Sequence, residues 1–413
     1  MNKQILIIFV CLFSTTLYGQ QATDSVLRGE PALAPPQIRS KFEDKYKMKN
    51  LQYGMSIGIE RTPKGRIWAC WVAGGDDQDA FFCLSYSDND GNKWSDVKFV
   101  LDPHNDTLPL ARRTIVGNLW TDPLGRLWLF FDQSMTYFDG RGGSWYSICE
   151  NPDSNHPNWS EPVRIWHGVS LQKPTVLSNG NWVLPVSLWG RDKIRMYGDS
   201  QWLKHPYQEQ YHQLDSLRAA HVLVSKDQGL TWERRGYVVF PSQTFDEHMI
   251  VELKDGRWWM TARTGKQGIC QSFSADQGQT WTAPTKYLNN QSARHFIRRL
   301  SSGNLLLVKH GDINERTKKR SKLMAYISKD DGKTWEGGLM LDEREGVSYP
   351  DGFQAPDGMI FMAYDYNRAK NGDFLLAKFT EQDVLNKKIS STNGVLRQLI
   401  SRPGNISGSK KQK

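Results

Sequence analysis

Ionisable side chains recur at two matched positions of a sixfold repeat in this chain. One position lies nine residues before a recurring glycine, and the other lies seven residues after it. Positions that only fill a strand core should carry apolar residues, so charged residues there indicate a site. Carboxylates, arginines, a histidine and a tyrosine brought together could bind an anion or carry out nucleophilic and acid–base chemistry. The ionisable members are Asp132, Glu247, Arg263, Arg294, His310, Tyr349 and Asp365.

The glycines that define this repeat each separate two apolar runs, which is typical of β-hairpins. Gly256, for example, follows the apolar stretch 249–251 and precedes Trp258 and Trp259. Six matched hairpins predict an all-β chain folded as a six-bladed β-propeller, whereas a β-sandwich would leave the sixfold match unexplained. The innermost strands of a propeller line its axis, so the matched positions should converge there. The six glycines are Gly65, Gly125, Gly180, Gly256, Gly303 and Gly358.

A second motif, S-x-D-x-G-x-T-W, occurs in four copies that span residues 87–94, 225–232, 274–281 and 328–335. Only the first copy departs from it, with Asn89 and Lys93 at the Asp and Thr positions. The aspartate can accept hydrogen bonds from turn amides, the glycine tolerates a positive φ, and the tryptophan can fill the gap between blades. We expect these motifs on outer turns, as scaffold and not as catalytic residues.

The ends of the chain predict export. Lys3, the apolar run 5–13 and a small-residue cleavage point at Gly19 indicate a signal peptide over residues 1–19. Residues 20–40 should form a flexible lead, 41–400 the propeller, and 401–413 a basic, disordered tail. We therefore expect a periplasmic or secreted protein. No later segment is apolar and long enough for membrane insertion.

Composition narrows the choice of partner. The formal charge is +9, but much of the surplus lies in residues 318–320 and in the C-terminal tail, and no nucleic-acid motif accompanies it. No Cys/His spacing indicates a metal, and no cofactor is expected. Cys70 and Cys83 flank the first hairpin, so both a cross-strand disulfide and two buried thiols are open. We expect a monomer that takes a glycan or oligosaccharide.

Over residues 40–385 the sequence resembles the sialidase (neuraminidase) superfamily. The resemblance rests on the S-x-D-x-G-x-T-W motifs, the six hairpins and several specific segments. Residues 245–253 resemble the segment whose glutamate, here Glu247, assists the nucleophile, and Gly346–Tyr349 resembles the segment with the nucleophilic tyrosine. Residues 260–263 and Arg320 resemble segments that bear two arginines of a carboxylate-binding triad.

The same resemblance implies roles that other residues should fill. The family places an Arg-Ile-Pro motif on the first strand of blade one, but residues 52–57 contain no arginine, so Arg112 or Arg113 would have to complete the triad. The acid/base aspartate should follow the second strand of blade one, where Asp76, Asp77 and Asp79 are available, and we nominate Asp77 and Asp79. The nominated substrate-binding residues are Arg113, Asp132, Arg263, His310, Arg320 and Asp365.

Three functions are consistent with the sequence. The preferred one is an exported, exo-acting, retaining glycoside hydrolase that releases a terminal acidic sugar, sialic acid being the leading candidate. Tyr349 would be its nucleophile, a plan that sialidases use in place of two carboxylates. The second is a glycosidase or lyase for another sugar of plant or algal polysaccharides, with His248, His310 or Asp132 in acid/base roles. The third is a carbohydrate-binding propeller without catalysis.

Overall fold

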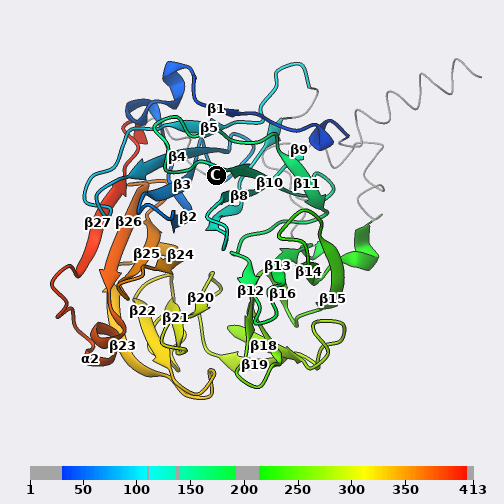
Figure 1. Ribbon diagram of the computed structural model, residues 1–413, viewed down its shortest axis with the longest axis vertical. Coiled ribbons are helices and arrows are strands. Elements are labelled where there is room, and N and C mark those ends of the chain that lie inside the picture. The colour runs from blue at the N-terminus through cyan, green and yellow to red at the C-terminus, as the bar shows by residue number, and fades with distance from the viewer. Residues whose placement is uncertain (1–29, 109–110, 136–139, 192–213, 407–413) are drawn as a thin grey trace, which may run out of the picture.

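Six antiparallel sheets stand around a central axis in the computed structural model, which describes residues 30–108, 111–135, 140–191 and 214–406 (Figure 1). The innermost strands are β2, β7, β12, β16, β20 and β24, and each meets its outer neighbour at one of the six glycine turns. The predicted six-bladed propeller is confirmed. The signal peptide expected over residues 1–19 lies outside the described residues.

Each blade is a sheet of four strands in chain order, except that the first blade gains a fifth, outermost strand from the N-terminal segment. From the inside outward, blade one consists of β2 (Met55–Arg61), β3 (Ile67–Ala73), β4 (Phe81–Ser87), β5 (Phe99–Leu101) and β1 (Ile38–Arg39), and blade two of β7 (Gly117–Thr121), β8 (Leu127–Asp132), β10 (Ser144–Cys149) and β11 (Val163–Trp166). Blade three consists of β12 (Thr175–Val176), β13 (Trp182–Ser187), β14 (Ala220–Ser225) and β15 (Glu233–Val238), and blade four of β16 (Gln243–Glu252), β17 (Trp258–Thr264), β18 (Ile269–Ser274) and β19 (Thr285–Leu288). Blade five consists of β20 (Phe296–Arg299), β21 (Leu305–His310), β22 (Leu323–Ser328) and β23 (Glu336–Asp342), and blade six of β24 (Val347–Gln354), β25 (Ile360–Tyr366), β26 (Asp373–Phe379) and β27 (Val395–Ser401).

Short elements complete the fold. The strands β6 (Arg112–Arg113) and β9 (Ser134–Met135) form a two-stranded ladder beside blade two. Three 3₁₀ turns, η1 (Glu30–Leu33), η2 (Asp44–Tyr46) and η3 (Met48–Asn50), precede β2. The helix α2 (Glu381–Asn386) joins β26 to β27. Among the described residues, no helix has the length and apolar character needed to cross a membrane.

The S-x-D-x-G-x-T-W motifs are closed turns. In the second copy, Asp227 Oδ1 accepts a hydrogen bond from the Thr231 amide at 2.9 Å, and Oδ2 accepts one from the Thr231 hydroxyl at 2.5 Å. The Ser225 hydroxyl accepts the amide of Gly229 at 2.7 Å. Because these side chains bond within their own turn, the motif stabilises the blade edge and leaves the chemistry to other residues.

The boundaries of the propeller differ from those predicted. Residues 30–40, expected to belong to a flexible lead, form η1 and the strand β1, whose Ile38 pairs with Leu101 of β5. At the other end, the amides of Gly404 and Asn405 donate to the carbonyls of Met48 and Leu51 at 2.8 and 2.9 Å. These backbone bonds hold residues that composition alone indicates to be disordered.

The possible disulfide between Cys70 and Cys83 is absent, and both thiols are buried and free. In the β3–β4 ladder Cys70 pairs with Leu84 and Cys83 pairs with Trp71, an offset of one residue. Since neighbouring residues of a strand point to opposite faces, the two sulfurs lie on opposite faces of the sheet.

We therefore expect a reducing agent to leave the melting temperature of the purified protein unchanged. Thiol titration after denaturation without reductant should detect Cys70, Cys83, Cys149 and Cys270 as free thiols. A melting temperature that falls on reduction, or fewer titratable thiols, would contradict this register.

Candidate active site

The pair Tyr349 and Glu247 forms the centre of the candidate site. Both residues are buried and lie on inner strands, Tyr349 near the start of β24 and Glu247 in the middle of β16. The Tyr349 hydroxyl donates a hydrogen bond of 2.8 Å to Glu247 Oε1, across 102 positions of sequence. A tyrosine bonded to a buried carboxylate is the arrangement needed for a phenol to act as a nucleophile assisted by a base.

The backbone at both residues is locally unusual. Tyr349 has a φ of +54° and Glu247 a φ of +46°, a left-handed conformation that is uncommon for residues with a side chain. Each sits at an irregularity of the inner ladder, between Ser348 and Asp351 in β24 and between Asp246 and Met249 in β16. Such bulges redirect side chains at strand ends. A bulge with a residue in the left-handed conformation thus positions both Tyr349 and Glu247.

Three arginines from different blades surround the pair, and we call Arg263, Arg320 and Arg368 the arginine cluster. Arg263 Nη1 donates to Glu247 Oε1 at 2.8 Å, and Arg320 Nη1 donates to the Ser348 hydroxyl at 2.8 Å. The guanidinium carbons of Arg320 and Arg368 lie 5.8 and 4.1 Å from the centre of the Tyr349 ring. This concentration of positive charge around a tyrosine suits a carboxylate-bearing ligand.

Arg368 was missed by the sequence analysis. It lies in the loop between β25 and β26, three residues after the matched position of Asp365, and the sixfold register covers strands but not loops. Its Nε donates to Asp365 Oδ1 at 2.9 Å, and its Nη1 lies 3.9 Å from Asp76 Oδ2. Asp365 also accepts the Ser56 amide at 3.1 Å, which ties the arginine to the first strand of blade one. Blade six thus places an arginine beside the first strand of blade one.

Through backbone hydrogen bonds, Gly346 links the segments that carry Arg320, Tyr349 and Arg368. Its amide donates to the carbonyl of Arg320 at 2.7 Å, and its carbonyl accepts the amide of Asn367 at 3.0 Å. Its φ is +95°, and a Cβ built here would lie 2.2 Å from the Asn367 side chain. Only glycine fits at this junction.

Charge and burial set the protonation of the pair. Burial, followed by the charge of Glu247, raises the pKa of Tyr349 to about 12 despite the opposing arginine cluster. Burial alone would also raise the pKa of Glu247, but the charges of Arg263 and Arg320 outweigh it and hold that pKa below its ordinary value. At neutral pH the shared proton therefore resides on the phenol, and Glu247 is an anion.

The nominated acid/base aspartates lie in the turn after β3. Asp77 Oδ1 accepts the amide of Asp79 at 2.9 Å, and burial raises the pKa of Asp77. Asp76 is the aspartate of this turn that faces Arg368, and its side chain is 39 % exposed. Asp76 therefore lies toward the arginine cluster, whereas Asp77 stabilises its own turn by accepting the Asp79 amide.

Two nominated binding residues of blade two lie within the scaffold. Asp132 Oδ1 accepts the amides of Ile115 and Val116 at 2.7 and 2.9 Å. Arg113 is fully buried, and its charge acts on Asp132 and Asp77, lowering the pKa that burial raises in each. The structure does not bring these two residues to Tyr349.

His310 and Arg294 are both buried and contact residues at or next to the Tyr349–Glu247 pair. His310 Nε2 lies 3.0 Å from the carbonyl of Val347, at the start of the strand that carries Tyr349. Arg294 Nη2 donates to Gln172 Oε1 at 2.9 Å, and its guanidinium lies 5.7 Å from the Tyr349 ring centre. Gln172 in turn donates to the Glu247 carbonyl at 3.0 Å. Sequence reasoning could not reveal Gln172, because it lies before β12 and outside the matched positions.

Buried His310 should make stability pH-dependent. Burial lowers the pKa of His310 to about 3, so below about pH 6.5 the unfolded chain binds a proton that the folded chain does not. Acidification therefore lowers the free energy of unfolding. From pH 7 to pH 5, the stability advantage of wild type over His310→Gln should shrink by about 2 kcal/mol.

Chemical denaturation at both pH values measures this difference, and the exposed His156→Gln serves as the control. A gap between wild type and His310→Gln that stays constant with pH would contradict a neutral, buried His310.

The described residues contain no group of three or more His, Cys, Asp or Glu side chains arranged to hold a metal ion. The residues that meet at the candidate site are Tyr349, Glu247, the arginine cluster and Asp76.

Comparison with known proteins agrees with this architecture. A family model described as a BNR repeat-like domain matches residues 65–362. The chain belongs to this family. No curated protein matched the sequence. The family model thus establishes the family assignment.

Several solved structures share the fold. A protein of unknown function from Dyadobacter fermentans DSM 18053 is 14% identical with a TM-score of 0.53, over 82% of this chain and 96% of that one. The intramolecular trans-sialidase from Ruminococcus gnavus is 13% identical with a TM-score of 0.57, over 84% of this chain and 98% of that one. The Hadza microbial sialidase Hz136 is 15% identical with a TM-score of 0.57, over 77% of this chain and 64% of that one, so the match spans less than two thirds of its length.

Proposed function

We propose that this protein is an exported, exo-acting, retaining glycoside hydrolase that releases a terminal sugar bearing a carboxylate, with sialic acid the leading candidate. The observation that carries the proposal is the 2.8 Å hydrogen bond from Tyr349 to Glu247 inside the arginine cluster. The likeness to sialidase structures supports it at the level of the fold.

A carboxylate on the anomeric carbon explains the choice of a tyrosine. A negatively charged Asp or Glu nucleophile would meet like charge at that carbon, whereas a neutral phenol does not. The arginine cluster would hold the substrate carboxylate by charge-assisted hydrogen bonds. Arg263 and Arg320 come from blades four and five, and Arg368 replaces the arginine that blade one lacks.

Proton transfer must accompany attack. Because the pKa of Tyr349 is about 12 and that of Glu247 is below its ordinary value, the free phenolate is scarce at neutral pH. As the phenol oxygen forms its bond to the anomeric carbon, its proton passes to Glu247 Oε1 along the existing hydrogen bond.

Asp76 is our candidate for protonating the leaving oxygen. It faces Arg368, and its partly exposed carboxyl can receive a proton from water. After the leaving group departs, the same carboxylate would activate the water that hydrolyses the glycosyl–tyrosine bond and regenerates Tyr349. Asp77 and Asp79 stay as alternatives in the same turn.

The direct test is incubation of the purified protein with a fluorogenic aryl sialoside, with proton NMR of the anomer released first. Release with retained configuration supports the proposal. A polysaccharide panel assayed for new reducing ends and for unsaturated sugars would reveal instead a glycosidase or a lyase for another glycan. Binding without turnover across both sets would contradict the enzyme proposal and favour a carbohydrate-binding propeller.

A further inference from the structure

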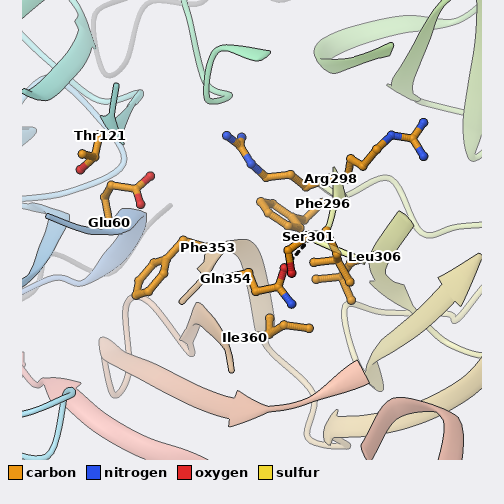
Figure 2. A pocket seen from close by; sticks show the side chains of 11 residues that line it. Glu60, Thr121, Phe296, Arg298, Ser301, Leu306, Phe353, Gln354 and Ile360 are labelled. Atoms are coloured by element: carbon orange, nitrogen blue, oxygen red, sulfur yellow. Dashed lines mark hydrogen bonds between the residues drawn. The ribbon is translucent and has the colours of Figure 1, made fainter. Parts of the chain in front are cut away.

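A cavity opens at the other end of the propeller axis from Tyr349. Tyr349 lies near the start of β24 and Gln354 ends it, so the two are separated by roughly 16 Å of extended chain. Gln354 lines a cavity of about 300 Å³ together with Glu60 near the end of β2 and Thr121 at the end of β7. Figure 2 shows Glu60 and Phe353 on one side of this opening and Phe296 and Gln354 on the other.

A buried polar network closes the axis between the two ends. Lys173 Nζ lies 3.0 Å from Glu60 Oε2 and 3.1 Å from Asp351 Oδ2. Arg294 Nη2 lies 3.3 Å from Asp351 Oδ1. The two carboxylates are therefore matched by the two cations Lys173 and Arg294. This network lies between the cavity and the Tyr349 pair.

Arg298 is a further cation on this end of the axis. It lies on β20, lines the cavity and is partly buried. Within the described part of the chain its guanidinium has no hydrogen-bond or ion-pair partner, although Glu60 and Asp351 are near enough to act on its charge. Burial lowers the pKa of Arg298. The positive charges around this end thus exceed the negative ones by one.

In contrast to Arg298, the neighbouring Arg299 has hydrogen-bond partners. Its Nη1 donates to Asp331 Oδ1 at 2.8 Å, and its Nη2 donates to the Glu252 carbonyl at 2.8 Å. The Glu252 carboxylate accepts the amide and the hydroxyl of Ser178, at 2.6 and 2.9 Å. Arg299, Asp331 and the Glu252 carboxylate therefore already have hydrogen-bond partners.

The walls of the cavity define what could pair with Arg298. Phe296, Phe353 and Ile360 give it an apolar lining, and Gln354 and Ser301 add polar groups. A guanidinium presents a planar set of donors that matches a carboxylate. The volume is at the lower end of the range for small-molecule sites.

We propose that this end of the axis is a second binding site for a small organic carboxylate with a compact, ring-sized apolar body, and that Arg298 binds its carboxylate. The site is independent of the proposed glycosidase chemistry. It would allow a small acid to bind the propeller without entering the Tyr349 cluster.

Calorimetric titration with benzoate tests the proposal, with benzyl alcohol as the uncharged control. Three proteins are compared: wild type, Arg298→Gln, and Arg320→Gln, which weakens the other cluster able to hold a carboxylate. The benzoate binding that depends on Arg298 should be the same in wild type and in Arg320→Gln. Arg298→Gln should weaken its affinity about tenfold or more, because a charge-assisted hydrogen bond is lost.

Each other outcome overturns the proposal. Binding lost in Arg320→Gln but kept in Arg298→Gln would place the carboxylate at the Tyr349 cluster. No binding to wild type at millimolar concentration, or equal binding of benzyl alcohol, would also overturn it. The melting temperature of Arg298→Gln shows whether that variant folds, and Arg298→Lys, which keeps the charge, should retain part of the affinity.

Discussion

Replacing Tyr349 with phenylalanine should reduce turnover of an aryl sialoside by about a thousandfold or more, since removing a nucleophile abolishes the covalent route. The ring that packs under Arg368, with 4.1 Å between the guanidinium carbon and the ring centre, is kept. Only the hydroxyl that donates to Glu247 is lost. Substrate affinity should therefore change much less than kcat.

A matched control is available in the same blade. The hydroxyl of Tyr364, another buried tyrosine, donates to Asp342 at 3.2 Å, so Tyr364→Phe removes a comparable hydrogen bond away from the site. Steady-state kinetics of both variants should show kcat falling only for Tyr349→Phe. Equal activity in the two variants would remove Tyr349 from the mechanism.

Replacing Arg368 with methionine should lower kcat/KM for a carboxylated substrate by about 10- to 100-fold. In the proposed mechanism Arg368 binds the substrate carboxylate, and a charge-assisted hydrogen bond to a carboxylate contributes about 1.5–3 kcal/mol. Arg368→Lys should fall between wild type and methionine, because it keeps the charge but not the planar contact with Tyr349.

The control for this experiment is Arg344→Met. Arg344 also stacks on a tyrosine, 3.8 Å from the Tyr366 ring centre, and also pairs with an aspartate, Asp342. It thus reproduces the interactions of Arg368 without a place in the arginine cluster. If both variants lost the same activity, the effect would be structural and the assignment of Arg368 would fail.

The sequence predicted strand positions well and loop positions poorly. Glycine turns fix the register of each inner hairpin, so the sequence alone placed Tyr349, Glu247 and Arg263 at matched positions of the repeat. Asp132 occupies the same register, yet it caps its own blade by accepting two backbone amides. The register predicts the strand position of a residue, but not which hydrogen-bond donors lie nearest to its side chain.

Arg368 and Asp76 show why the remaining contacts of the site could not be predicted from the sequence. Each lies in a loop, and they meet because blade six closes against blade one, 292 residues earlier in the chain. Loop conformation depends on local contacts such as the junction at Gly346, which no periodic pattern encodes. The disulfide question was likewise decided by a one-residue offset between Cys70 and Cys83, which spacing alone does not give.

The central claim is that Tyr349 forms a covalent bond to the sugar. Peptide mass spectrometry after rapid quenching tests it, using an aryl sialoside with a fluorine beside the anomeric carbon to slow hydrolysis of the intermediate. A glycosyl adduct should form on the peptide containing Tyr349, and none should form in Tyr349→Phe. Turnover of the unfluorinated substrate with inverted configuration, or an adduct on another residue, would contradict it.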